Sequence, residues 1–107
     1  MTHHLAAALG AALLAATTAS AAPGAAQGRE VACQGWFEMA GVVMTHRQAG
    51  GPRAAADAIA SEIDAELRPQ LDRIIDAAWA TAPGDPEAHE DIVYYFAEEI
   101  FATCMNG

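Results

Sequence analysis

The chain contains two cysteines, Cys33 and Cys104, and each lies on the apolar face of a segment with helical periodicity. Cys33 opens the first such segment and Cys104 ends the last, so an antiparallel arrangement of these segments brings the two sulfur atoms together. Closing a loop of about seventy residues stabilises a fold by roughly 4 kcal/mol in the chain-entropy treatment. A structural bridge is favoured over a redox role, because the C-x-x-C spacing that lowers a thiol pKa is absent. The sequence therefore predicts a Cys33–Cys104 disulfide.

Residues 1–22 have the pattern of a cleavable secretion signal. An apolar run from Leu5 to Ala16 is followed by small residues that suit signal peptidase. The run is shorter than the roughly 20 apolar residues needed to span a bilayer, so a membrane anchor is disfavoured; the alternative is a first helix of the domain. We expect a signal peptide at 1–22, a flexible leader at 23–30 and a helical domain at 31–107. The expected location is the periplasm or the cell exterior, where disulfides form.

Four segments of the predicted domain each have one apolar face at three- and four-residue spacing, which is typical of helices. The first face has Cys33, Phe37, Ala40 and Met44; the second has Ala55, Ile59, Ile63 and Leu67; the third has Leu71, Ile74, Ile75, Ala78 and Trp79; the fourth has Ile92, Val93, Phe96, Ile100 and Cys104. The predicted fold class is all-α, a small four-helix antiparallel bundle closed by one disulfide.

Glycine and proline mark the ends of these segments. Gly50 and Gly51 can end the first helix, since glycine adopts the left-handed conformation. Pro52 suits the first turn of the second helix. Pro69 either begins a third helix or kinks one long helix. Asp85 is placed to cap the fourth helix, with proline at its first position.

The charge balance excludes some partners. The chain has 14 acidic residues against five arginines and no lysine, a formal net charge of −9. Nucleic acid is disfavoured because phosphate binding depends on Lys and Arg. Anionic membrane surfaces are disfavoured for the same reason, and we expect no membrane insertion after cleavage. Nothing in the sequence indicates a cofactor.

The first helical segment carries a second apolar stripe, made of Trp36, Met39 and Val43. Such a helix is either central to the bundle or offers an apolar face to a partner. The central position is favoured, because Met and aromatic residues at helical spacing are usually core. The stripe remains a candidate partner face, for another protein or for self-association. Arg47, at the edge of this helix, is a candidate for a structural ion pair with a carboxylate of another helix.

The sequence offers few side chains that could act in catalysis or bind a metal. Both thiols are assigned to the disulfide, and Ser61 is the only serine beyond the predicted signal peptide. His89 lies among four carboxylates, yet the spacing of these residues does not match a defined metal site. We expect His89 to be partly buried, because it shares a helix side with apolar residues. The sequence therefore predicts no enzyme, and no catalytic or metal-ligating residue is assigned.

Three features follow one another along the predicted domain: Cys33, the run Arg47-Gln48-Ala49-Gly50, and Cys104. In this layout the chain resembles a group of small exported helical proteins of Gram-negative bacteria. The resemblance spans nearly the whole predicted domain. It implies a helical fold and an exported location, and no activity. A looser likeness is to the periplasmic acid-stress chaperones, which are also small, helical and held by one disulfide.

Three function hypotheses follow, in decreasing order of support. The first is an exported non-enzymatic binding protein with an unknown partner. The second is a periplasmic acid-stress holdase, in which protonation of the carboxylates at low pH loosens the packing and frees the first helix. The weakest is a metal-dependent enzyme that uses the His89 cluster.

Overall fold

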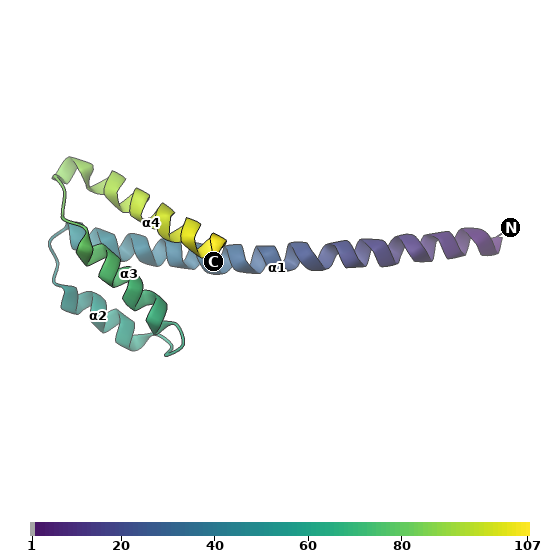
Figure 1. The fold of residues 1–107 in the computed structure, drawn as a ribbon, viewed down its shortest axis with the longest axis horizontal. Coiled ribbons are helices and arrows are strands. Elements are labelled where there is room, and N and C mark those ends of the chain that lie inside the picture. The colour runs from purple at the N-terminus through teal and green to yellow at the C-terminus, as the bar shows by residue number, and fades with distance from the viewer. Residues whose placement is uncertain (1) are drawn as a thin grey trace. The chain divides into compact units, whose positions relative to one another are not determined.

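The computed structural model describes the backbone of residues 2–107 and the side chains of residues 24–107. Every regular element in this part of the chain is helical (Figure 1). The elements are α1 (Thr2–Gln48), α2 (Arg53–Glu62), α3 (Arg68–Ala80), the 3-10 turn η1 (Pro86–Ala88) and α4 (His89–Asn106). The predicted all-α class is confirmed.

The chain divides into two units, residues 1–32 and residues 33–107, and α1 runs through both. The predicted signal peptide, residues 1–22, lies outside the residues whose side chains are described, so its cleavage stays a prediction. In the first unit, residues 24–32 are helical and exposed. The sequence predicts a flexible leader at 23–30; the backbone there is helical, and its flexibility stays a prediction. Ala, Gln, Arg and Glu in this stretch favour a helix and outweigh the cost of its two glycines.

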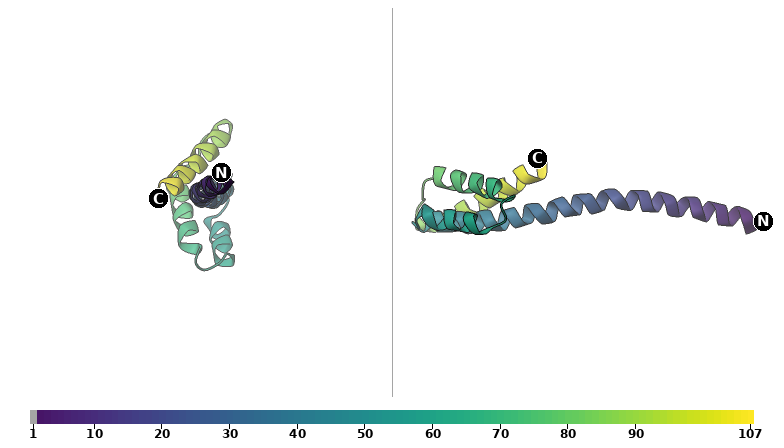
Figure 2. Two further views of the ribbon diagram at one scale, coloured as in Figure 1. Left: turned by 90° about the vertical axis from the view of Figure 1, so that its right-hand side faces the viewer. Right: turned by 90° about the horizontal axis from the view of Figure 1, so that it is seen from below.

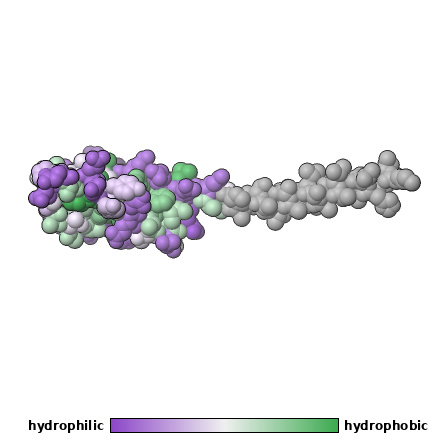
Figure 3. All heavy atoms as spheres, turned by 90° about the horizontal axis from the view of Figure 1, so that it is seen from above, coloured by the Kyte–Doolittle hydropathy of each residue, from purple (hydrophilic) through white to green (hydrophobic). Residues whose placement is uncertain are grey.

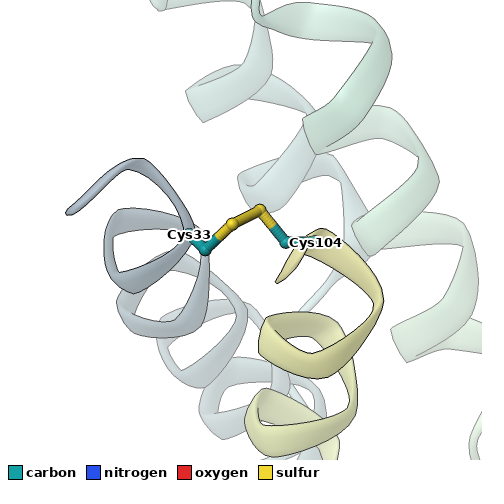
Figure 4. Close-up of a disulfide and its surroundings, with 2 residues drawn as sticks. All are labelled: Cys33 and Cys104. Atoms are coloured by element: carbon teal, nitrogen blue, oxygen red, sulfur yellow. A yellow bond between two sulfur atoms is a disulfide. The ribbon is translucent and has the colours of Figure 1, made fainter. Parts of the chain in front are cut away.

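In the second unit the helices alternate in direction and form a bundle around the last turns of α1. α4 lies on one side of α1, and the α2–α3 pair lies on the other (Figures 1 and 2). Cys33 of α1 and Cys104 of α4 form the predicted disulfide, with a Cα–Cα distance of 5.6 Å (Figure 4). The disulfide joins residues 71 positions apart, so it ties the opening of the domain to its last helix.

The core is formed where α3 packs against α1. Leu71, Ile74 and Ile75 are fully buried, as is Met44 of α1. The apolar face predicted for the third segment is therefore confirmed. Burial of each large aliphatic side chain contributes about 1.5–3 kcal/mol. In a domain of this size, these few side chains supply much of the stabilising free energy.

The second helix is shorter than the sequence predicts, and its predicted inner face is only half right: Ile59 and Ile63 pack against the core, whereas Ala55 and Leu67 are exposed. α2 ends at Glu62, and Ile63 has extended backbone angles. The buried residues of α2 are Ala56 and Ala60, whereas Leu67 is 43% exposed. Because α2 stops five residues before Leu67, the helix does not carry that side chain to the core, and Ala56 and Ala60 are the fully buried residues instead. Pro69 is the second residue of α3, so it begins a separate helix.

The C-terminus of α1 closes on glycine, as predicted. Gly50 has a φ of 82°, a conformation that costs other residues free energy. The Gly51 N–H donates to the His46 carbonyl at 3.0 Å, and the Gly50 N–H donates to the Arg47 carbonyl at 3.1 Å. These two bonds make a Schellman motif, which satisfies carbonyls that the helix end would leave unpaired.

The start of the fourth helix differs from the prediction. The 3-10 turn η1 precedes α4, and the Asp85 side chain makes no capping hydrogen bond. Instead the Ala88 N–H donates to the Asp85 backbone carbonyl at 2.9 Å, because the tight turn brings the main chain close enough to satisfy itself. Further along α4, Ala97 is buried, and Ile92, Val93, Phe96 and Ile100 are half-buried against the core.

Candidate binding groove

The stripe of Trp36, Met39 and Val43, for which the sequence favours a central position over a partner face, is largely part of the core. Val43 is only 2% exposed, and Trp36 and Met39 are half-buried and packed against the buried cluster. Val43 therefore cannot contact a partner in the folded domain. The physical reason is that the last turns of α1 are flanked by α4 on one side and by the α2–α3 pair on the other, so these turns need more than one apolar face.

An open apolar groove lies elsewhere, between α1 and α4, with a volume of about 840 Å³. We call it the α1–α4 groove. Its wall on α1 extends from Phe37 to Ala49, about 18 Å along the helix axis. The residues that line it are Phe37, Glu38, Gly41, Val42, Thr45, His46, Ala49, Glu90, Val93, Tyr94 and Ala97.

Two large side chains of the groove are exposed to solvent. Val42 is 56% exposed and Tyr94 is 52% exposed. Figure 3 shows the molecule from above, relative to the view of Figure 1. On this face, hydrophobic residues are exposed among hydrophilic ones. Exposed apolar side chains gathered in one groove are a usual mark of an interaction site.

Aromatic contacts fix one wall of the groove. The Phe37 ring meets the edges of Tyr94 and Phe101 at centroid distances of 6.4 and 6.3 Å. The Tyr94 hydroxyl donates to the Glu98 carboxylate at 2.6 Å. This hydrogen bond, together with the negative charge of Glu98, raises the pKa of Tyr94. The Tyr94 ring is thus held by an aromatic contact with Phe37 and by the hydrogen bond of its hydroxyl.

The formal charges of the described lining residues are negative. Glu38 and Glu90 line the groove, and no arginine lies among the described lining residues. Glu38 lies five residues after Cys33 in α1. Glu90 lies in the first turn of α4, far along the chain from Cys104. Because α1 and α4 are antiparallel and joined at Cys33 and Cys104, the two carboxylates lie toward opposite ends of the groove.

Arg47 is turned away from this groove, and its predicted ion pair with a carboxylate is wrong. Its Nε donates to the Thr81 carbonyl at 3.1 Å, and its guanidinium lies 5.6 Å from the centre of the Trp79 ring. Carbonyls at a helix C-terminus carry partial negative charge and attract cations, and an aromatic face does the same. The arginine thus serves as a cap for the end of α3.

Gln48 and His89 hold the connection between α3 and α4. Gln48 is 4% exposed, and its Oε1 accepts a hydrogen bond of 2.8 Å from the Gly84 N–H. The Nε2 of His89 donates to the Gly84 carbonyl at 2.8 Å, so this nitrogen carries the proton. His89 is half-buried, as expected. Both polar groups of Gly84 are therefore paired with side chains, which fixes where α4 begins and hence the width of the groove.

The described residues can be compared with the metal-site and membrane hypotheses. Among residues 24–107, no three His, Cys, Asp or Glu side chains are grouped closely enough to hold a metal ion. The hypothesis of a metal-dependent enzyme depends on His89, and the Nε2 of this residue donates a hydrogen bond to the Gly84 carbonyl. Within the described part of the chain, no helix has the length and hydropathy to cross a bilayer.

Comparisons with protein families, with curated proteins and with solved structures give no match for this chain. The groove and its charges therefore have to be interpreted from their own geometry.

Proposed function

We propose that the chain is an exported, non-enzymatic binding protein whose α1–α4 groove takes up apolar side chains of a partner protein. The observation that supports the proposal is the exposure of Val42 and Tyr94 within a groove of about 840 Å³. Residues of a partner that cover these side chains would remove apolar surface from water, which is favourable by about 25 cal/mol per Å².

Export is supported by two features. Residues 1–22 have the pattern of a secretion signal, and the disulfide between Cys33 and Cys104 is typical of compartments beyond the inner membrane. Expression in a Gram-negative host followed by fractionation and intact-mass measurement tests this part. We expect a periplasmic or extracellular product that lacks residues 1–22 and has no free thiol. A cytoplasmic product of full mass would contradict it.

A neutral hydrophobic dye tests the groove itself. Nile red is suitable because it carries no charge, so the acidic surface does not repel it. We expect the oxidised protein to bind it at neutral pH, and we expect Val42→Ser to weaken binding roughly fivefold, since a valine contact is lost. The matched control is Leu67→Ser, because Leu67 is also exposed, at 43%, and is not among the residues that line the groove.

The outcomes separate the hypotheses. Equal loss of binding in both variants, or none in either, would contradict a role for the groove. Dye binding that begins only below about pH 3 would favour the acid-stress holdase, because carboxylate protonation and loosened packing would then be required.

A further inference from the structure

The chemistry of the partner can be narrowed from the charges and the shape of the α1–α4 groove. The inference rests on the proposed function, since it concerns the same groove. Its floor is apolar, with Val42, Val93 and Ala97, and its described carboxylates are Glu38 and Glu90. Glu98 adds a third negative charge beside the groove through its bond to Tyr94.

This pattern disfavours a second copy of the chain as the occupant. Two copies facing each other through this groove would bring Glu38 and Glu90 of one copy near the same residues of the other. The overall charge of −9 adds further repulsion. An anionic lipid surface is disfavoured for the same reason. A partner with positive charge is complementary to the groove and would be steered toward it.

Gly41 opens the middle of the floor. A Cβ atom built at Gly41 would meet only Val93 Cγ1, at 4.0 Å, which is ordinary van der Waals contact. The absence of a Cβ at Gly41 therefore leaves room for at least a methyl group beside Val93, close to the backbone of α1. The wall of about 18 Å corresponds to roughly three turns of a helix, which is enough for apolar side chains at three- and four-residue spacing.

We propose that the α1–α4 groove binds a cationic amphipathic helix of a partner protein. Apolar side chains of that helix lie on the floor around Gly41, Val42 and Val93. Its Lys or Arg side chains lie near Glu38 at one end of the groove and near Glu90 at the other.

Designed peptides test the partner's chemistry. Each has about 14 residues, enough to span the groove, with one Leu–Ala face and a polar face of Lys, Gln or Glu. We expect the Lys peptide to bind the oxidised protein about tenfold more tightly than the Gln peptide, because two rim ion pairs each contribute modestly. The Glu peptide should bind more weakly than either. The Lys preference should shrink as salt is added, since exposed charges are screened.

A matched pair of variants assigns the preference to the groove. Glu38→Gln with Glu90→Gln should remove the preference for the Lys peptide over the Gln peptide, because both carboxylates that attract the lysines are neutralised. Glu62→Gln with Glu66→Gln changes the net charge equally at exposed positions away from the groove, and should keep the preference. Gly41→Leu should block the Lys peptide, whereas Gly35→Leu should not, because a Cβ at Gly35 meets nothing within 4 Å and Gly35 is not among the residues that line the groove.

The possible results distinguish the cationic partner helix from the proposed binding function of the groove. Nile red binding with no difference between the Lys and Gln peptides would overturn the cationic partner and leave the proposed function standing. A preference that survives Glu38→Gln with Glu90→Gln would also overturn it, since attraction would then come from overall charge. Dimerisation through the groove, detected by sedimentation and abolished by Gly41→Leu, would replace the partner helix with a second copy. Failure of every peptide and of the dye would contradict the proposed function itself.

Discussion

The buried side chain of Gln48 accepts a hydrogen bond of 2.8 Å from the backbone N–H of Gly84, which lies 36 residues later in the chain. The same amide group, through its Nε2, lies 3.5 Å from the Ala82 carbonyl. The C-terminus of α1 is thereby joined to the segment that leads into α4. The position of α4 relative to α1, and hence the groove between them, depends on this contact at one end and on the disulfide at the other.

Replacing Gln48 with alanine should therefore destabilise the domain. The substitution leaves the Gly84 N–H without its partner, and an unpaired buried polar group costs about 1–3 kcal/mol. Urea denaturation followed by circular dichroism measures the change in the free energy of unfolding. Gln34→Ala is the control, because Gln34 is on the same helix and is exposed. Equal stability of the two variants would show that the contact contributes nothing.

Two glycines, Gly35 within α1 and Gly50 just after its end, should respond in opposite directions to alanine. Gly50→Ala should destabilise by about 1–2 kcal/mol, because Gly50 has a φ of 82° and a Cβ atom is strained in the left-handed region. Gly35→Ala should stabilise by about 0.5–1 kcal/mol, because Gly35 is within the helix and a Cβ there meets nothing within 4 Å. Thermal unfolding of both variants checks the prediction. A melting temperature that moves the same way in both would contradict it.

The disulfide should contribute strongly to stability. Cys33 and Cys104 close a loop with a sequence separation of 71 residues, so we expect the double substitution Cys33→Ser with Cys104→Ser to lower the free energy of unfolding by roughly 4 kcal/mol. Urea denaturation of the double variant and of the oxidised protein measures the difference. A difference below about 1 kcal/mol would show that α1 and α4 are held together without the bond.

The titration of Tyr94 should depend on Glu98. The hydrogen bond to Glu98 and the charge of Glu98 raise the pKa of Tyr94 above its ordinary value of 10.0. A raised pKa means that the protonated phenol is favoured in the folded state. The associated stability is present below pH 10.0 and is lost as the pH rises through the raised pKa. Glu98→Gln should lower the pKa of Tyr94 toward 10.0 in an ultraviolet titration of the phenolate.

Glu99→Gln is the control for this titration, because Glu99 is the exposed neighbour of Glu98 and makes no hydrogen bond to Tyr94. If both substitutions shift the phenolate titration equally, the effect comes from overall charge and not from the hydrogen bond.

Features that depend on local periodicity could be predicted from the sequence. The four helices, the buried face with Leu71, Ile74 and Ile75, and the Cys33–Cys104 disulfide are all present as expected. The helices and the buried face follow from side chains that a helix places on one side, whatever the neighbouring helix is. The disulfide follows from the positions of the two cysteines near opposite ends of the domain, in helices that run antiparallel.

Features that depend on a neighbouring segment of the same chain could not be predicted from the sequence. The inner face of α2 is set by its early end at Glu62, and no glycine or proline marks that end in the sequence. Arg47 has no carboxylate partner because the end of α3 offers carbonyls and the Trp79 ring. A buried Gln48 has no local signal, since its partner is in a distant segment. The groove arises only when α1 and α4 are placed side by side.

The binding surface can be mapped most directly by nuclear magnetic resonance on the isotope-labelled, oxidised protein, during titration with the Leu–Ala–Lys peptide. The account predicts that the amide signals of Gly41, Val42, Val93 and Ala97, all of which line the α1–α4 groove, shift together and saturate. Signals of Ala56 and Asp72, which are not among the lining residues, should not move. Shifts centred on α2 and α3, or no saturable shift at any peptide concentration, would contradict the account.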